Sequence, residues 1–447
     1  MRLYTADHMA PHNAVDSPPA SSSDEPSIGG RLRRLVPRLG LTVISLAALV
    51  AVGEVAVRSL TKVDKRLTVR DPVIGKRYVR DFDDEVFVPE SGRRVHLRFN
   101  RDGFRGPDRP YEKPAGTRRI AVIGDSMTIA VATAEERTMV VELERLLAAT
   151  FPTESWEVLN FGVSSASTGQ ELVLYRKLVW RYQPDIVLLA FFVGNDLTDN
   201  SRRLTSARRI YFDLGDKGGV RQLPYSATAG GLSGWLNQHS RLYVWYRILR
   251  TRSRERVREI TGRKASRFLI FDTAGNEDLD HAWELTRRLL AEFHHEVSAR
   301  GSQLAVAVIP SGPQIYDDLW AEVLSAAGRD AAFFDRDHPE HAIRGICREL
   351  EVPCVTITEA FREAAETGPQ KGNKRLFYNK GRAHFTDAGN RLAAEILFDL
   401  LAGELENGPA DAPADGQSPV SATTLGPTAK PSRRGSPTPV KTPDLEL

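Results

Sequence analysis

Between about Arg118 and Ala402, short apolar segments alternate with longer segments whose apolar residues recur at helical spacing. This alternation is typical of a parallel sheet with helices packed on both of its faces. The segment 185–196 is apolar over most of its length, as expected for a strand buried on both faces. The sequence therefore predicts a three-layer α/β/α domain with a mainly parallel sheet. The predicted strands are RIAVIG (119–124), EVLNFGV (157–163), DIVLLAFFVGND (185–196), QLAVAVIP (303–310) and PCVTIT (353–358).

Changes in composition divide the rest of the chain. Residues 1–30 and 403–447 are rich in small and polar residues and have no apolar period, so both are predicted to be disordered tails. Residues 61–117 are predicted to be a linker and lead-in to the main domain, which spans 118–402. An insertion at about 201–278 carries a basic, partly amphipathic helix. A solvated cap helix is favoured there over a membrane-surface or polysaccharide-facing one.

Residues 31–60 are predicted to anchor the chain in a membrane. Four arginines lead into an apolar run, 39–57, whose length is about the minimum for a spanning helix. Glu54 is the only charged residue in that run and lies near its far end, where a charge costs less than at the bilayer centre. A cleaved signal peptide and a buried core helix fit less well beside the long tail and the basic flank. The arginines favour a cytoplasmic N-terminus and a main domain that is periplasmic or extracellular.

Charge balance and the scarcity of cysteine argue against several classes of protein. The chain has 61 basic and 58 acidic residues, a net charge of +3, which does not indicate nucleic-acid binding. Its two cysteines cannot form a disulfide framework or a cysteine-rich zinc site. Cys347 and Cys354 could pair in an oxidising compartment, or could be two buried thiols. No cofactor and no metal are expected.

Polar clusters follow three of the predicted strands. Gly-Asp-Ser (124–126) follows the first, NFGVSSAST (160–168) the second and Gly-Asn-Asp (194–196) the third, while His384 lies just before the last helix. In an open parallel sheet, ligands bind beyond the carboxyl ends of the strands, so we expect the fold to bring these clusters together. Together they supply a nucleophile, a base and candidate oxyanion donors.

These blocks, in this order, resemble the SGNH or GDSL hydrolases over roughly residues 95–402. The leader NRDGFRG (100–106) is similar to a segment that often precedes the GDS strand in membrane-anchored members. The resemblance implies the flavodoxin-like SGNH fold and two-step ester hydrolysis. Ser126 would attack an ester carbonyl, with His384 as general base and then general acid. The oxyanion would be held by the Ser126 backbone N–H, a donor from the second block and the Asn195 side chain.

The second block departs from the family pattern at one position. Where the family usually has its oxyanion glycine, this chain has Ser165, and Gly162 lies three residues earlier. A serine N–H can still be donated, provided that the local φ is not one that only glycine tolerates. Ser165 is therefore assigned as the donor, with Gly162 as a supporting turn residue.

The histidine block departs further, because the family's aspartate two or three residues before the histidine is absent. Gly381 and Arg382 stand there instead, and an arginine disfavours the imidazolium that forms during catalysis. Another carboxylate could fold in from elsewhere, or a backbone carbonyl could orient His384 and leave a Ser–His dyad. The domain could also be a weak catalyst with a binding role. The candidate carboxylates are Asp335, Asp337 and Asp387.

The sequence thus predicts a serine ester hydrolase that acts outside the cytoplasm. Its location makes O-acyl or O-acetyl esters of envelope polysaccharide the expected substrates, with lipid esters next, although a fold by itself does not fix a substrate. Two alternatives are an O-acyltransferase that uses the same serine and a catalytically weak binding or scaffold module of an envelope complex.

Overall fold

The computed structural model describes residues 28–61, 66–205, 207–225, 231–260, 265–326, 330–367, 376–377 and 384–406. The predicted disordered tails lie almost wholly outside these residues. The main helices of the domain are α2 (Ser126–Ile129), α3 (Met139–Thr150), α4 (Thr168–Lys177), α5 (Asp196–Asn200), α8 (Glu277–Ser298), α9 (Gly312–Ile315), α10 (Asp317–Ala326), α11 (His338–Glu349), α12 (Thr358–Thr367) and α14 (Asp387–Glu406).

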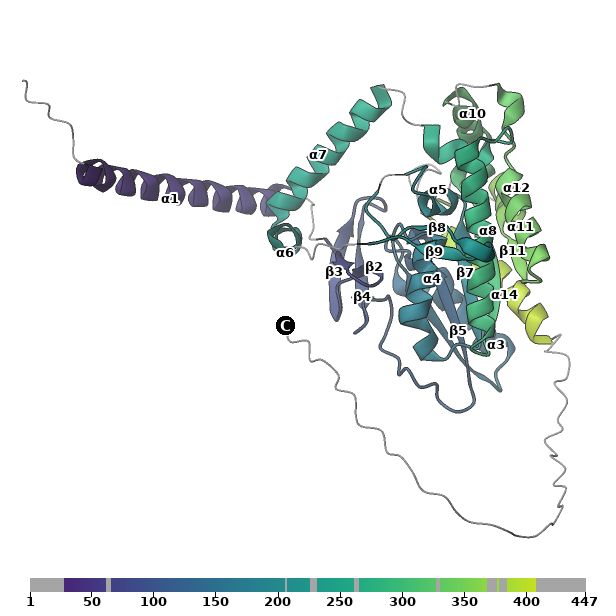
Figure 1. Cartoon of the computed structure of the whole chain (residues 1–447). Coiled ribbons are helices and arrows are strands. Elements are labelled where there is room, and N and C mark those ends of the chain that lie inside the picture. The colour runs from purple at the N-terminus through teal and green to yellow at the C-terminus, as the bar shows by residue number, and fades with distance from the viewer. Residues whose placement is uncertain are drawn as a thin grey trace, which may run out of the picture. The chain divides into compact units, whose positions relative to one another are not determined.

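A five-stranded parallel sheet forms the centre of the domain, with the order β11-β10-β7-β5-β6 (Figure 1). Numbered along the chain within this sheet, the order is 2-1-3-4-5, which is the order of flavodoxin-like folds. The prediction of a three-layer α/β/α domain with a parallel sheet is confirmed. The strands are β5 (Thr117–Gly124), β6 (Ser155–Gly162), β7 (Ile186–Phe192), β10 (Gln303–Ile309) and β11 (Cys354–Thr356).

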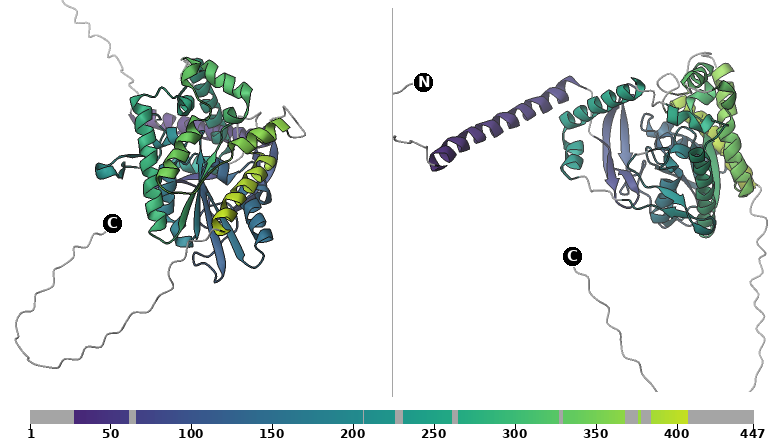
Figure 2. Two further views of the ribbon diagram at one scale, coloured as in Figure 1. Left: turned by 90° about the vertical axis from the view of Figure 1, so that its right-hand side faces the viewer. Right: turned by 45° about the horizontal axis from the view of Figure 1, so that its top comes forward.

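Both faces of the sheet are covered, which explains its nearly continuous apolar strands. Ala121 and Ile123 of β5 belong to a core that also includes buried side chains of α4, α8 and α11. Ile120 and Val122 alternate with them and are buried on the opposite face. Figure 2 shows α14 crossing one face of the sheet, and α14 is joined to α3 by a 3.1 Å hydrogen bond from the Met139 N–H to Asn390 Oδ1.

Residues 66–106, predicted as part of a lead-in, form two antiparallel hairpins, and we call them the hairpin segment. Their strands are β1 (Thr68–Asp71) with β2 (Gly75–Tyr78), and β3 (Phe82–Val88) with β4 (Arg93–Phe99). Alternate residues of β3 and β4 are buried in a second, smaller core, which also contains Ile129 and Ala132. The hairpin segment therefore packs against the chain just beyond α2.

Helix α1 (Ile28–Leu60) includes Pro37–Leu60, the one helical stretch among the described residues that is long and apolar enough to cross a membrane. Its end is joined to the insertion. The Glu54 carboxylate accepts hydrogen bonds from the backbone N–H groups of Arg241 (2.9 Å) and Leu242 (3.1 Å), which have no partner within their own helix. Glu54 thus caps α7. The insertion consists of β8 (Phe212–Leu214), β9 (Val220–Gln222), α6 (Gly231–His239) and α7 (Arg241–Ile260).

Candidate active site

Ser126 lies where β5 turns directly into the short helix α2. Asp125 is buried and caps this helix, because its Oδ1 accepts a hydrogen bond from the Met127 N–H at 2.8 Å. A side chain on Gly124 would collide with Thr128, so glycine allows the strand and the helix to meet this closely. The Ser126 side chain is partly exposed, and its Oγ lies 3.4 Å from Asp125 Oδ2. Since β5 lies between β6 and β7, Ser126 is at the switch point of the sheet, where ligands bind in such folds.

The second block lies directly beside this corner. Gly162 ends β6 opposite Gly124, and the Val163 N–H donates to the Gly124 carbonyl at 3.0 Å. Gly162 does not have a positive φ, so it is not needed for a turn. A side chain there would collide with the backbone of Ile129, so glycine allows β6 to pack closely against α2. Ser165, in contrast, has φ +60°, in the left-handed region that non-glycine residues visit at a cost. This backbone geometry is the one that favours glycine, and serine adopts it here.

The third block is tied to the second. Asn195 Nδ2 donates to the carbonyl of Ala166, the neighbour of Ser165, at 3.0 Å. The buried Asp196 accepts a hydrogen bond from the Phe192 N–H at 2.8 Å, which fixes the loop at the end of β7. The loops that carry Ser126, Ser165 and Asn195 are therefore connected at one edge of the sheet by hydrogen bonds.

The carboxylate that contacts His384 is Glu90, which the sequence analysis did not identify. Glu90 lies in the turn between β3 and β4, and its two oxygens are 2.9 and 2.7 Å from His384 Nδ1. Its Oε1 also accepts the His384 backbone N–H at 2.7 Å. The two residues are 294 positions apart, so no local spacing could have indicated the pair.

The three carboxylates proposed from the sequence have other partners. Asp387 pairs with Arg93 at 2.7 Å, and Asp337 pairs with Arg362 at 2.5 Å. Asp335 accepts the backbone N–H of Asp337. Their assignment to His384 is therefore corrected to Glu90. Gly381 and Arg382, at the positions where the family has its aspartate, lie outside the described residues.

Electrostatics at the histidine are set by the two carboxylates around it. Burial lowers the pKa of His384, but the hydrogen bond and charge of Glu90, together with the charge of Asp125, raise it above its ordinary value. Burial raises the pKa of Glu90, and its hydrogen bonds with His384 outweigh this and lower it. Burial dominates at Asp125 and raises its pKa. No direct hydrogen bond joins His384 to Ser126 Oγ, but the carbonyl of the next residue, Phe385, accepts a 3.5 Å hydrogen bond from Thr133 Oγ1, just beyond α2. Hydrogen bonds between a catalytic histidine and serine are often long before substrate binds.

The hairpin segment also supports the first two blocks. Arg105 is buried, and its guanidinium donates to the carbonyls of Ile129 (2.9 Å) and Thr133 (2.6 Å), just beyond α2. Lys76 Nζ donates to the carbonyl of Ser164, and the Tyr78 hydroxyl forms a hydrogen bond with Ser164 Oγ. The neighbour of Ser165 is therefore held by two side chains from β2.

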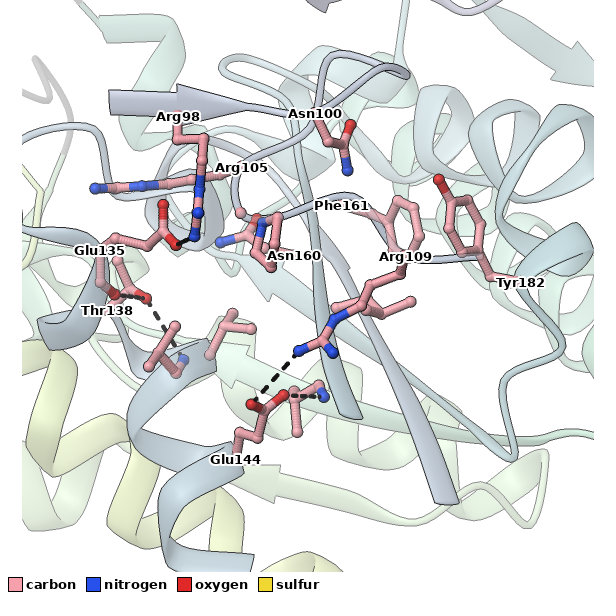
Figure 3. Close-up of a pocket in the computed structure, with 16 residues that line it drawn as sticks. Arg98, Asn100, Arg105, Arg109, Glu135, Thr138, Glu144, Asn160, Phe161 and Tyr182 are labelled. Atoms are coloured by element: carbon pink, nitrogen blue, oxygen red, sulfur yellow. Dashed lines mark hydrogen bonds and ion pairs between the residues drawn. The ribbon is translucent and has the colours of Figure 1, made fainter. Parts of the chain in front are cut away.

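A separate pocket of about 180 Å³ lies between the hairpin segment, α3 and β6 (Figure 3). Arg98 pairs with Glu135 at 2.5 Å across it, and Arg109 approaches Glu144 at 3.9 Å. Neither Ser126 nor His384 lines this pocket, so it is not part of the candidate active site. The two cysteines, Cys347 and Cys354, are free thiols and lie outside the candidate active site.

Comparisons with known proteins add little to this geometry. No family model and no curated protein matches the chain. Among solved structures, a two-domain esterase active on acetylated mannans is 12% identical with a TM-score of 0.35, over 69% of this chain and 54% of that one. This chain therefore spans about half the length of that esterase. An alpha/beta hydrolase from the metagenome of Lake Arreo, Spain, is 13% identical with a TM-score of 0.37, over 65% and 97% of the two chains. An acetylxylan esterase from Geobacillus stearothermophilus, in the form of a catalytic mutant, is 13% identical with a TM-score of 0.36, over 64% and 94%. At such low sequence identities and TM-scores, similarity to these solved structures does not assign an activity to this chain.

Proposed function

We propose that this chain is a serine ester hydrolase of SGNH type, with Ser126 as nucleophile, His384 as base and Glu90 as the carboxylate that orients the histidine. The observation that carries the proposal is the contact of both Glu90 oxygens with His384 Nδ1. A weak-catalyst reading depended on a missing carboxylate, and Glu90 supplies one. The order of roles matches that of a Ser-His-acid triad.

The first step is attack of Ser126 Oγ on the ester carbonyl carbon. Because Glu90 binds the Nδ1 side of His384, the imidazole accepts the serine proton on Nε2. The imidazolium that forms is stabilised by the Glu90 charge. The tetrahedral intermediate then collapses, the bond to the alcohol oxygen breaks, and His384 returns the proton to the departing alcohol.

The second step releases the acyl group. A water molecule gives a proton to His384 and attacks the acyl carbon, and the bond to Ser126 Oγ breaks as the proton returns to the serine. In both steps the developing oxyanion would be stabilised by the backbone N–H groups of Ser126 and Ser165 and by Asn195 Nδ2. Asn195 Nδ2 donates to the Ala166 carbonyl at 3.0 Å and to Asp199 Oδ2 at a longer 3.5 Å. The N–H that faces Asp199 would exchange this long contact for the oxyanion.

Location and substrate are inferred from the anchor. Pro37–Leu60 would cross the membrane, with the N-terminus in the cytoplasm and the main domain outside. O-acyl or O-acetyl esters of envelope polysaccharide, or lipid esters, are the substrates that such a location favours. A transferase that uses the same serine would differ in one respect, because its product would form only when an acceptor hydroxyl compound is added.

The experiment is covalent labelling of the full chain in detergent with a fluorophosphonate probe, with Ser126→Ala and the exposed control Ser155→Ala in parallel. We expect the parent and Ser155→Ala to be labelled and Ser126→Ala to remain unlabelled, because only an activated serine reacts rapidly with the probe. If the folded parent takes up no more label than Ser126→Ala, the hydrolase proposal fails and a binding role replaces it.

A further inference from the structure

A second cavity, of about 840 Å³, lies between the hairpin segment and the helices α6 and α7. Five basic side chains line it, and no carboxylate is among its described lining residues. Trp235 and Leu232 of α6 are also in its wall, and both are exposed. The basic residues are Arg66, Arg70, Lys76, Arg208 and Arg247.

The positive charges in this cavity act on one another. Lys76 and Arg247 are half-buried, whereas Arg66, Arg70 and Arg208 are exposed. Burial, together with the charges of Arg209 and Arg66, lowers the pKa of Lys76 to about 8, although Asp125 and Asp199 act in the opposite direction. Burial and the charge of Arg247 likewise lower the pKa of Arg66. Cations held together in this way repel each other, and a bound anion would relieve that repulsion. Arginine side chains suit phosphate because their planar N–H groups can donate to two oxygens at once.

The cavity lies next to the end of the candidate membrane span. Besides the cap that Glu54 forms on α7, Arg58 Nη2 donates to the carbonyl of His239 in α6 at 3.1 Å. Figure 1 shows α6 and α7 beside the C-terminal end of α1. Trp235, of which 55% is exposed, and Tyr246, of which 52% is exposed, give these helices the amphipathic aromatic residues found at membrane interfaces.

We infer that this cavity binds the phosphate-bearing headgroup of an anionic membrane lipid, with the arginines around the phosphate and Trp235 and Leu232 against the acyl chains. The inference rests on the proposed membrane anchor but not on esterase activity. Lys76 lines the cavity and also bonds to Ser164, so the headgroup site shares a wall with the loop that carries Ser165. A lipid bound there would hold the candidate active site at the membrane surface.

The test is calorimetric titration of the full chain in neutral detergent with dihexanoyl phosphatidic acid, inorganic phosphate and dihexanoyl phosphatidylcholine. We expect saturable binding of the phosphatidic acid, at least tenfold tighter than that of the other two ligands. The affinity should fall as NaCl is raised from about 50 mM to about 500 mM, because salt screens charge pairs. Equal affinity for inorganic phosphate would overturn the lipid assignment, and absence of saturable binding would overturn the site.

Variants separate the parts of the site. Arg66→Gln and Arg247→Gln should each weaken phosphatidic acid binding about tenfold or more, since each removes a charge-assisted hydrogen bond. Arg70→Gln should weaken it less. Arg66 and Arg70 are both exposed, so the variants at these two positions carry little risk to folding. Trp235→Ala should weaken binding of the lipid but not of inorganic phosphate. The matched control is Arg391→Gln on α14, where the arginine forms an exposed pair with Glu395, and it should bind within twofold of the parent.

Unchanged affinity in all of the cavity variants, with folding verified by circular dichroism, contradicts the inference. Fluorophosphonate labelling of Ser126 is measured on the same samples. Loss of lipid binding with retained labelling separates the lipid site from the hydrolase proposal, and retained binding with absent labelling leaves the lipid site standing alone.

Discussion

The central sheet and the hairpin segment contribute to the candidate active site in different ways. The ends of the sheet strands carry the candidate nucleophile and oxyanion donors in short local motifs. Asp125 and Gly124, for example, fix the Ser126 corner within a few residues. The hairpin segment contributes supports from a distance. Glu90 orients His384, Arg105 holds the chain beyond α2, and Lys76 binds the loop before Ser165.

This difference shows that the motifs and their supports are separable parts of the site. The end of β5 and the start of α2 are consecutive in the chain, so the hydrogen bonds around Ser126 form whenever the sheet forms. The Glu90–His384 pair forms only if the β3–β4 hairpin also docks, which it does through a separate small core. We therefore expect changes in the sheet motifs to remove the chemistry, and changes in the hairpin segment to weaken it or to loosen the site.

The largest effect should follow from loss of the reacting groups themselves. Ser126→Ala, His384→Ala and the double variant should each lose on the order of 10⁴-fold or more in kcat for a soluble ester, and the double variant should lose no more than the single ones. Residues that act as one unit give this non-additive result. Turnover of p-nitrophenyl acetate by the three proteins checks it, and additive losses would contradict a shared role.

Replacing Glu90 tests whether the hairpin segment takes part in the chemistry. Glu90→Gln keeps the size and an accepting oxygen but removes the charge that stabilises the imidazolium, so kcat should fall by about 10²–10⁴ with little change in KM. Glu85→Gln is the matched control, because Glu85 lies on β3 and makes only an exposed pair with Arg94. A Glu90→Gln enzyme as active as the control would make His384 independent of the hairpin.

Removing the Arg105 guanidinium should affect stability more than chemistry. Arg105→Gln leaves buried carbonyls without donors, so the free energy of unfolding should fall by about 2–3 kcal/mol. Denaturant unfolding measures this, with Arg101→Gln as an exposed control. Equal midpoints for the two variants would show that the hairpin segment is not tied to α2 through Arg105.

The pH dependence of activity should report the charge of Glu90. His384 must be neutral to accept a proton, so kcat/KM should rise with pH through a pKa that lies above the ordinary histidine value. Glu90→Gln removes the charge that raises this pKa, so the midpoint should move to lower pH. The prediction is checked by measuring kcat/KM against pH for the parent and for Glu90→Gln with one neutral ester. Coincident midpoints would contradict the assignment of Glu90 as the partner of His384.

The smallest effect is expected at Ser165. Ser165→Gly keeps the backbone N–H and removes the cost of a left-handed φ, so activity should change by less than about threefold and stability should rise by up to about 1 kcal/mol. Ser165→Pro, which removes the N–H, should lower activity much further. If Ser165→Gly is as impaired as Ser165→Pro, the side chain rather than the amide is what matters.

The α/β/α class and the places where polar blocks follow the strands could be predicted from the sequence. These are local properties, because alternation of apolar segments dictates a parallel sheet and a parallel sheet collects its strand ends at one edge. Serine, glycine and asparagine at those ends could therefore be assigned to one site without coordinates. The hairpins within residues 66–106 were not predicted, since their short strands resembled a polar lead-in.

Which carboxylate faces His384, and where the basic side chains of the hairpin segment and the insertion gather, became known only from the three-dimensional packing. Glu90 and His384 are separated by 294 residues. Arg66 of the hairpin segment and Arg247 of α7 in the insertion line the same cavity. Such contacts depend on how independently formed elements pack, and one sequence contains no periodicity that records that packing. Local motifs follow from covalent neighbours, whereas partners across the fold follow from the burial of apolar surface that brings their elements together.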